Sequence, residues 1–374
     1  MITSAVQKRS LLIGLALTLV TVFILFSILS SVRAQAGEFD RRAMLTSLSE
    51  NVILPCHEQF VASADDLATH VQSFYDSQDV ANLQQARAAW LETALTWQKC
   101  ELFSLAGFET MILHNRISKM PRTNLIEDLL ASSKDITAES LSGEGSTVKG
   151  VGAIEYILFQ ETAPEDVLNI LQNDARRLNY LLALSQNLAI EARGLRDFWL
   201  PEGGDYTSRF VVAEDASSSI KDSLNILVNE LIANLEQLAR DELGAPLGND
   251  NGGEPQPELA LGYLSGSSLQ LTRSKLEGIQ LALYNDQADG QLGLDDYLNF
   301  LTADDQLANQ LANGFAVAFE AIDVVDIPLA QAVYEKPAKV EAVYEAVREL
   351  VVLTKVDMAN QLGITVTFSD SDGD

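Results

Sequence analysis

The apolar residues of this chain recur at the spacing of amphipathic α-helices. One segment has them at alternating steps of four and three, at Phe60, Ala64, Leu67, Val71 and Phe74. A second segment has a similar spacing, at Leu83, Ala86, Trp90, Ala94 and Trp97. Such steps place the side chains on one face of a helix. The pattern therefore predicts two long helices, and Asp79 is the expected N-cap of the second.

Glycine and proline mark where the helices end. Pro164 is expected at the first turn of a long helix that runs to about Trp199, and residues 201–204 form a strong break. Residues 244–258 are the most linker-like stretch, and further helices fit 266–284, 303–323 and 336–361. Only residues 364–368 suggest a short strand. We predict an all-α fold of two tandem helical bundles, over residues 37–202 and 203–374.

The N-terminal segment, residues 1–36, is expected to direct export. Lys8 and Arg9 precede an apolar run over residues 10–32, and Ala34-Gln35-Ala36 is a small-x-small cleavage pattern. These features are typical of a secretory signal peptide. The run is also nearly long enough to span a bilayer, so an uncleaved anchor is the alternative. We expect a protein of the periplasm or outer-membrane periphery, touching the membrane only through this segment if it is retained.

Charge and cysteine content narrow the set of partners. The formal net charge of −28 repels nucleic acid and favours cations or basic partners, although it also serves solubility. Nucleic-acid binding is therefore excluded. The chain has two cysteines, Cys56 and Cys100. Export would permit a disulfide between them, and two buried thiols are the other reading.

Two acidic residues stand out as candidate ligands. Glu155 is the only charged residue between Lys149 and Glu161, in a segment that is apolar on all sides. Glu101 lies four residues after Trp97 and so continues an apolar stripe. A carboxylate in such a place must be paired, hydrogen-bonded, metal-bound or protonated. If the two met in space, they would form a site for a metal ion or a shared proton.

Two bases in the acidic second half are candidate partners of these carboxylates. Arg273 and Lys275 lie close together in a predicted helix. Either would neutralise a buried acid across the interface between the bundles. Of the two, Arg273 is the base we assign to the site.

Four segments, in order along the chain, resemble motifs of the imelysin family, also called the M75 peptidases. They are Asn51-Val52-Ile53-Leu54-Pro55, the stretch from Lys149 to Phe159, the stretch from Asp289 to Leu298, and the stretch from Leu362 to Phe368 with Asp372-Gly373-Asp374. The family's Gly-x-His-x-x-Glu motif maps its glycine onto Gly150 and its glutamate onto Glu155. Its histidine position is occupied by Gly152.

The resemblance implies an envelope protein of two helical bundles, linked to iron or haem uptake, in a family to which peptidase activity is attributed. A hydrolytic zinc site needs about three protein ligands and a water, and the missing histidine argues against one here. We therefore expect a binding protein for haem, iron or another divalent or trivalent cation. The expected site residues are Gly150, Gly152, Glu155, Glu101 and Arg273, with Glu155 and Glu101 as metal ligands. The alternatives are a metallopeptidase and an envelope protein-interaction module.

Overall fold

A computed structural model of the chain describes residues 39–104, 108–212, 223–285 and 290–366. Residues from Arg41 onward form one compact unit. The expected signal segment, residues 1–36, lies outside the described residues, so its cleavage stays a prediction. Within the described ranges, no helix is both long enough and apolar enough to cross a membrane.

All regular secondary structure in these ranges is helical, which confirms the all-α prediction. The helices of the first half are α2 (Arg41–Leu48), α3 (Leu54–Asp76), α4 (Val80–Cys100), α5 (Phe108–Ser118), α6 (Thr123–Ala131), α7 (Ala138–Ser142), α8 (Val151–Leu158), α9 (Pro164–Asn173) and α10 (Ala175–Trp199). Those of the second half are α11 (Tyr206–Val212), α12 (Ser223–Gln237), α13 (Ala245–Leu247), α14 (Ser268–Tyr284), α15 (Leu294–Thr302), α16 (Gln306–Val324), α17 (Leu329–Glu335), α18 (Pro337–Val352) and α19 (Ala359–Leu362). Short π-helical turns occupy Ser49–Ile53, Leu238–Gly244 and Leu353–Met358, and 3-10 turns occupy Glu101–Phe103, Ser146–Val148 and Pro257–Leu259.

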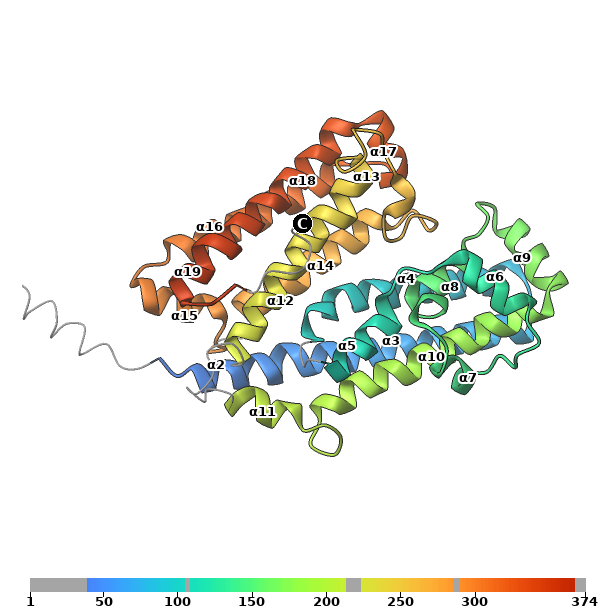
Figure 1. Cartoon of the computed structure of the whole chain (residues 1–374), viewed down its shortest axis with the longest axis horizontal. Coiled ribbons are helices and arrows are strands. Elements are labelled where there is room, and N and C mark those ends of the chain that lie inside the picture. Colours follow the sequence, from blue (N-terminus) through green and yellow to red (C-terminus); the bar gives the residue numbers. More distant parts are fainter. Residues whose placement is uncertain (1–38, 105–107, 213–222, 286–289, 367–374) are drawn as a thin grey trace, which may run out of the picture. The chain divides into compact units, whose positions relative to one another are not determined.

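Helix α3 packs against α4 and α10 in the first half (Figure 1). Every residue of the two predicted apolar stripes is buried, with at most 1% of its surface exposed. Asp79 caps α4 as expected, because its carboxylate accepts the backbone N–H of Asn82 at 2.9 Å. A disulfide joins Cys56 in α3 to Cys100 at the end of α4, with 5.6 Å between their Cα atoms. It settles the choice between a disulfide and two thiols.

Helix α14 of the second half packs against α4 of the first, and also against α16. Gly278 permits the close approach, because a Cβ at this position would collide with the carbonyl oxygen of Lys99. The first and second halves therefore meet along α4, whose last turn leads directly into Glu101. The division at residue 202 into two domains stays a prediction.

Three local expectations need adjustment. The long helix expected from Pro164 is two helices, because Asp174 interrupts it and caps α10 by accepting the N–H groups of Arg176 and Arg177. The linker-like stretch 244–258 begins as helix, because the chain continues from α12 through a π-helical turn and α13 to a left-handed Gly248. Residues 364–366 are irregular rather than a strand, and the rest of that expected strand lies outside the described residues.

Candidate functional site

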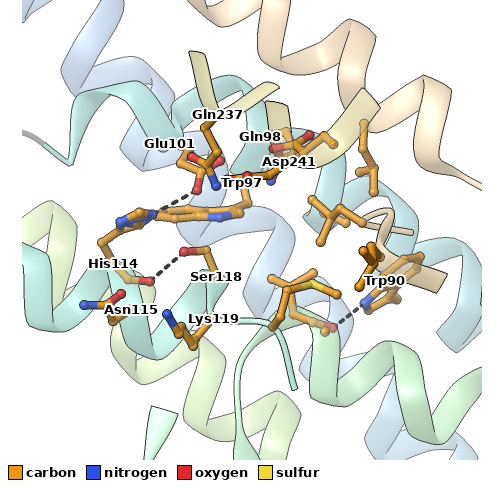
Figure 2. Close-up of a pocket in the computed structure, with 18 residues that line it drawn as sticks. Trp90, Trp97, Gln98, Glu101, His114, Asn115, Ser118, Lys119, Gln237 and Asp241 are labelled. Atoms are coloured by element: carbon orange, nitrogen blue, oxygen red, sulfur yellow. Dashed lines mark hydrogen bonds and ion pairs between the residues drawn. The ribbon is translucent and has the colours of Figure 1, made fainter. Parts of the chain in front are cut away.

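A pocket of about 340 Å³ lies where α4, α5 and α8 meet the end of α12, the π-helical turn after it, the segment before α14 and the first turn of α14. One face of α4 supplies Trp90, Ala94, Trp97, Gln98 and Glu101 to its wall. The remaining lining residues are His114, Asn115, Ser118, Lys119, Met120, Val151, Gly152, Gln237, Asp241, Glu242, Leu259, Leu261 and Leu271. Figure 2 shows Glu101, Gln237 and His114 gathered at one end, and Trp90 at the other. The pocket is therefore polar at one end and largely apolar at the other.

Glu101 is the centre of the polar end. It follows Cys100 directly and has only 4% of its surface exposed. One carboxylate oxygen, Oε1, lies 2.9 Å from Nε2 of His114, and the other, Oε2, lies 3.2 Å from the ammonium of Lys275. The disulfide at Cys100 anchors the backbone just before this carboxylate.

Lys275 connects two buried acids. Its ammonium also lies 2.8 Å from Glu242, and only 1% of the lysine surface is exposed. Burial alone would lower the pKa of Lys275, but the carboxylates of Glu101 and Glu242 outweigh it and raise this pKa. Burial raises the pKa of Glu242, while Lys275 acts to lower it. A charged lysine thus sits between two acids, at the position that a small cation would take.

The protonation of two neighbouring groups affects the net charge at the polar end of the pocket. Burial lowers the pKa of His114, against the attraction of Glu101 that would raise it, so the imidazole is neutral at pH 7. Burial, assisted by the charge of Glu101, raises the pKa of Glu230 to about 7. Glu230 on α12 is therefore about half protonated near neutral pH.

The two glycines of the motif fix how α8 meets the end of α5 and the segment after it. Gly150 has a φ of 83°, and a Cβ there would collide with the carbonyl oxygen of Ile117. Gly152 lines the pocket, and a Cβ there would lie 2.7 Å from Cδ of Pro121. A histidine at position 152 would therefore require Pro121 to move.

Glu155 has a different partner from Glu101. It is 6% exposed, and its Oε1 accepts the backbone N–H of Ser265 at 2.9 Å. Burial raises the pKa of Glu155, whereas the bonds from Ser265 and the amide of Leu264 act to lower it. Its carboxylate is thus satisfied mainly by backbone amides of a loop.

Arg273 does not take the role expected of it. Its guanidinium lies 2.7 Å from Asp323 and 3.4 Å from Glu277, and it covers the ring of Phe319. The partner of the buried acids is Lys275, the other base that was considered. Its position carried a signal, because Leu271, Lys275 and Ile279 follow one another at steps of four and so share the buried face of α14.

The pocket also contains residues outside the expected set of site residues. His114 comes from α5, 13 residues after Glu101, and Glu242 comes from the π-helical turn after α12, much further along the chain. Among the described residues, no group of three or more His, Cys, Asp or Glu side chains is arranged to hold a metal ion. With Gly152 in place of the histidine as well, the described residues do not fit a resident hydrolytic zinc.

Fold and site together define a class of protein. It is all-helical, and the pocket between its two halves is polar at one end. The family model of imelysin, peptidase M75, matches residues 53–356. The chain belongs to the imelysin family.

Known proteins with similar sequence or fold agree with this assignment. Iron-regulated protein A of Synechococcus elongatus is 23% identical over 287 residues, which cover 75% of this chain and 74% of that protein. An imelysin-like protein from Psychrobacter arcticum 273-4 has a similar crystal structure, with a TM-score of 0.72, 19% identity, and 88% of this chain and 97% of that one covered. A candidate iron-regulated protein A precursor from Parabacteroides distasonis ATCC 8503 has a TM-score of 0.71, 16% identity, and coverage of 87% and 95%.

Proposed function

We propose that this chain is an exported imelysin-family protein that binds an iron-containing ligand and serves iron acquisition in the cell envelope. The pocket around Glu101 carries the proposal. Support for iron comes from the name of the Synechococcus relative, iron-regulated protein A, and from the acidic character of the chain. Support for export comes from the N-terminal sequence, with its Lys8-Arg9 pair and long apolar run.

The composition of the pocket suits a small organic ligand or complex. Its volume of about 340 Å³ is near the lower end of the range for small-molecule sites, roughly 300–1,000 Å³. Trp90 offers apolar contact at one end (Figure 2), and the apolar side chains of Met120 and Leu259 also line the pocket. Glu101 and His114 offer hydrogen bonds at the other. Such a division orients a ligand that is itself polar at one end.

The iron enters in a form that brings most of its own ligands, namely haem or a ferric chelate. Glu101 and Glu242 already share the Lys275 ammonium, so a bare cation would have to displace a buried lysine. Displacement would leave that ammonium buried without a partner, which is costly. A bare ferric ion is the competing form, and the same titration decides between them.

Tryptophan fluorescence provides the test, because Trp90 and Trp97 line the pocket. Purified protein is titrated with haem, ferric citrate and ferric ion, each beside its iron-free counterpart. We expect saturable quenching by haem or ferric citrate that exceeds quenching by iron-free porphyrin or citrate. Affinity should fall about tenfold or more in His114→Ala, while Lys134→Met, which changes an ion pair with Glu144 that does not line the pocket, should bind as wild type. Equal quenching of the wild type and His114→Ala would count against the pocket.

Export has its own measurement. N-terminal sequencing of the protein from a periplasmic fraction should begin after Ala36 if the segment is cleaved. A chain that retains Met1 and sediments with membranes supports the anchor instead. Recovery of the full-length chain in the cytosol would contradict export in either form.

A further inference from the structure

The loop that follows the 3-10 turn Pro257–Leu259 forms one wall of the pocket. Leu259 and Leu261 line the pocket, and the chain then turns back toward α14. Gly262 and Gly266 both have positive φ, of 70° and 72°. The N–H of Ser267 donates to the carbonyl of Gly262 at 3.0 Å, which closes the turn. Residues 260–267 are called the wall loop below.

The wall loop lies on Glu155. The N–H of Ser265 donates to Oε1 of Glu155 at 2.9 Å, from a loop 110 residues further along the chain. Tyr263 and Leu264, the apolar side chains at its tip, are 38% and 40% exposed, so apolar burial holds the tip only in part. The carboxylate of Glu155 is therefore a principal attachment of the loop to the first half.

Helix α8 connects this attachment to the pocket. Val151 and Gly152, in its first turn, line the pocket, while Glu155 lies about one turn later and is not among the lining residues. The same short helix thus forms one part of the pocket directly and holds another part through the Ser265 amide. A hydrogen bond to a carboxylate is roughly twice as strong as one between neutral groups.

We propose that Glu155 is a positioning residue that holds the wall loop against the pocket, and that it acts on the ligand only through this loop. The proposal rests on the proposed function for the ligand but not for the loop itself. Without the carboxylate, the Ser265 amide loses its acceptor, and the loop is free to open at its two glycines. Leu261 in the loop, and Leu259 directly before it, then no longer hold a fixed place in the wall.

Hydrogen exchange of the full chain tests the loop without any ligand. Glu155→Leu removes the acceptor at similar volume, whereas Glu155→Gln keeps an oxygen that can accept the Ser265 N–H. We expect about tenfold or faster exchange at the Leu264 and Ser265 amides in Glu155→Leu, with α3 unchanged, and near-wild-type exchange in Glu155→Gln. Glu155→Gln is therefore the matched control, because Ser265→Ala, although it keeps the N–H, also loses the hydroxyl that donates to the Gly262 carbonyl at 3.2 Å. Unchanged exchange in Glu155→Leu would overturn the proposal.

The ligand titration then separates positioning from direct contact. We expect haem or ferric citrate to bind at least several-fold more weakly to Glu155→Leu, and Glu155→Gln to restore the affinity. A loss of affinity in Glu155→Gln with a protected loop would show direct contact and overturn the proposal. If no iron form binds the wild type, the proposed function fails, while the exchange result still decides the role of Glu155. Should Glu155→Leu fail to fold, Ser265→Pro deletes the same bond from the loop side, and unchanged exchange at Leu264 and Gly266 would then refute the attachment.

Discussion

Replacing Lys275 by methionine should strongly destabilise the protein. The change keeps a long side chain but removes an ammonium that lies 3.2 Å from Glu101 and 2.8 Å from Glu242. Removing one partner of a buried ion pair costs about 3–5 kcal/mol, because the remaining charge is buried without compensation. Here two carboxylates lose their counter-charge, and only Glu101 keeps a second partner, His114. We expect a loss of about 3–5 kcal/mol in the free energy of unfolding at pH 7.

The loss should shrink as the pH falls. Burial already raises the pKa of Glu242 in the presence of Lys275, so without the lysine this pKa rises further. An acid whose folded-state pKa lies above its unfolded value destabilises the fold at high pH, and that penalty disappears once the pH is low enough to protonate it in both states. The difference between Lys275→Met and wild type should therefore be smaller at pH 5 than at pH 7.

Urea unfolding followed by circular dichroism at both pH values measures this effect. A loss of that size should move the midpoint by roughly 1–2 M urea. Lys134→Met is the control, since Lys134 is 60% exposed in its pair with Glu144 and an exposed pair contributes at most about 1 kcal/mol. Adding Glu101→Gln and Glu242→Gln to Lys275→Met should recover part of the loss. If Lys275→Met costs no more than Lys134→Met, the assignment of a charged buried lysine is wrong.

Three further changes test other features of the fold. Reduction of the Cys56–Cys100 disulfide, which spans 44 residues, should lower the free energy of unfolding by about 4 kcal/mol, because the unfolded chain gains loop entropy; an identical urea midpoint with and without reductant would contradict this. Gly278→Ala should lower the free energy of unfolding by about 1–3 kcal/mol or more, because it forces α14 away from Lys99. Gly194→Ala in α10, whose Cβ would meet Leu113 at an ordinary 3.6 Å, should be neutral or stabilising. Thermal unfolding compares the two variants, and equal melting temperatures would argue against the close approach of α14 to α4. The pKa of Glu230 in the folded state is about 7, above its unfolded value, so ionised Glu230 destabilises the fold, and this destabilisation is absent at low pH and grows as the pH rises toward 7. Glu230→Gln should therefore flatten the fall of the urea midpoint between pH 5 and pH 8. An unaltered dependence of the midpoint on pH would show that another group titrates.

The sequence predicted the helices well where local rules govern them. The stripes of α3 and α4, the Asp79 cap and Pro164 in the first turn of a helix all depend on residues within a few positions of one another. The break at Asp174 was missed because the apolar period continues across it, and only the capping geometry reveals it.

The candidate site depends on contacts between distant segments, so it was less accessible to sequence reasoning. Glu101 and Gly152 were recognised as unusual, and the structure places both in the wall of one pocket. Nothing local indicates that Glu242 comes within reach of Lys275 or that His114 meets Glu101. The choice between Arg273 and Lys275 depended on helix phase, which favours the residue four positions from Leu271 and Ile279.

The buried charges around the Lys275 ammonium are distributed unevenly between the two halves of the chain. A fragment of residues 37–202 would keep Glu101 but would lose the ammonium that neutralises it. A fragment of residues 203–374 would keep Lys275 together with Glu242. The second half thus contains the positive charge that pairs with its own buried acid, Glu242. The first half has its buried acid, Glu101, paired with an ammonium from the second half. Glu101 of the first half therefore depends on the second half for its positively charged partner.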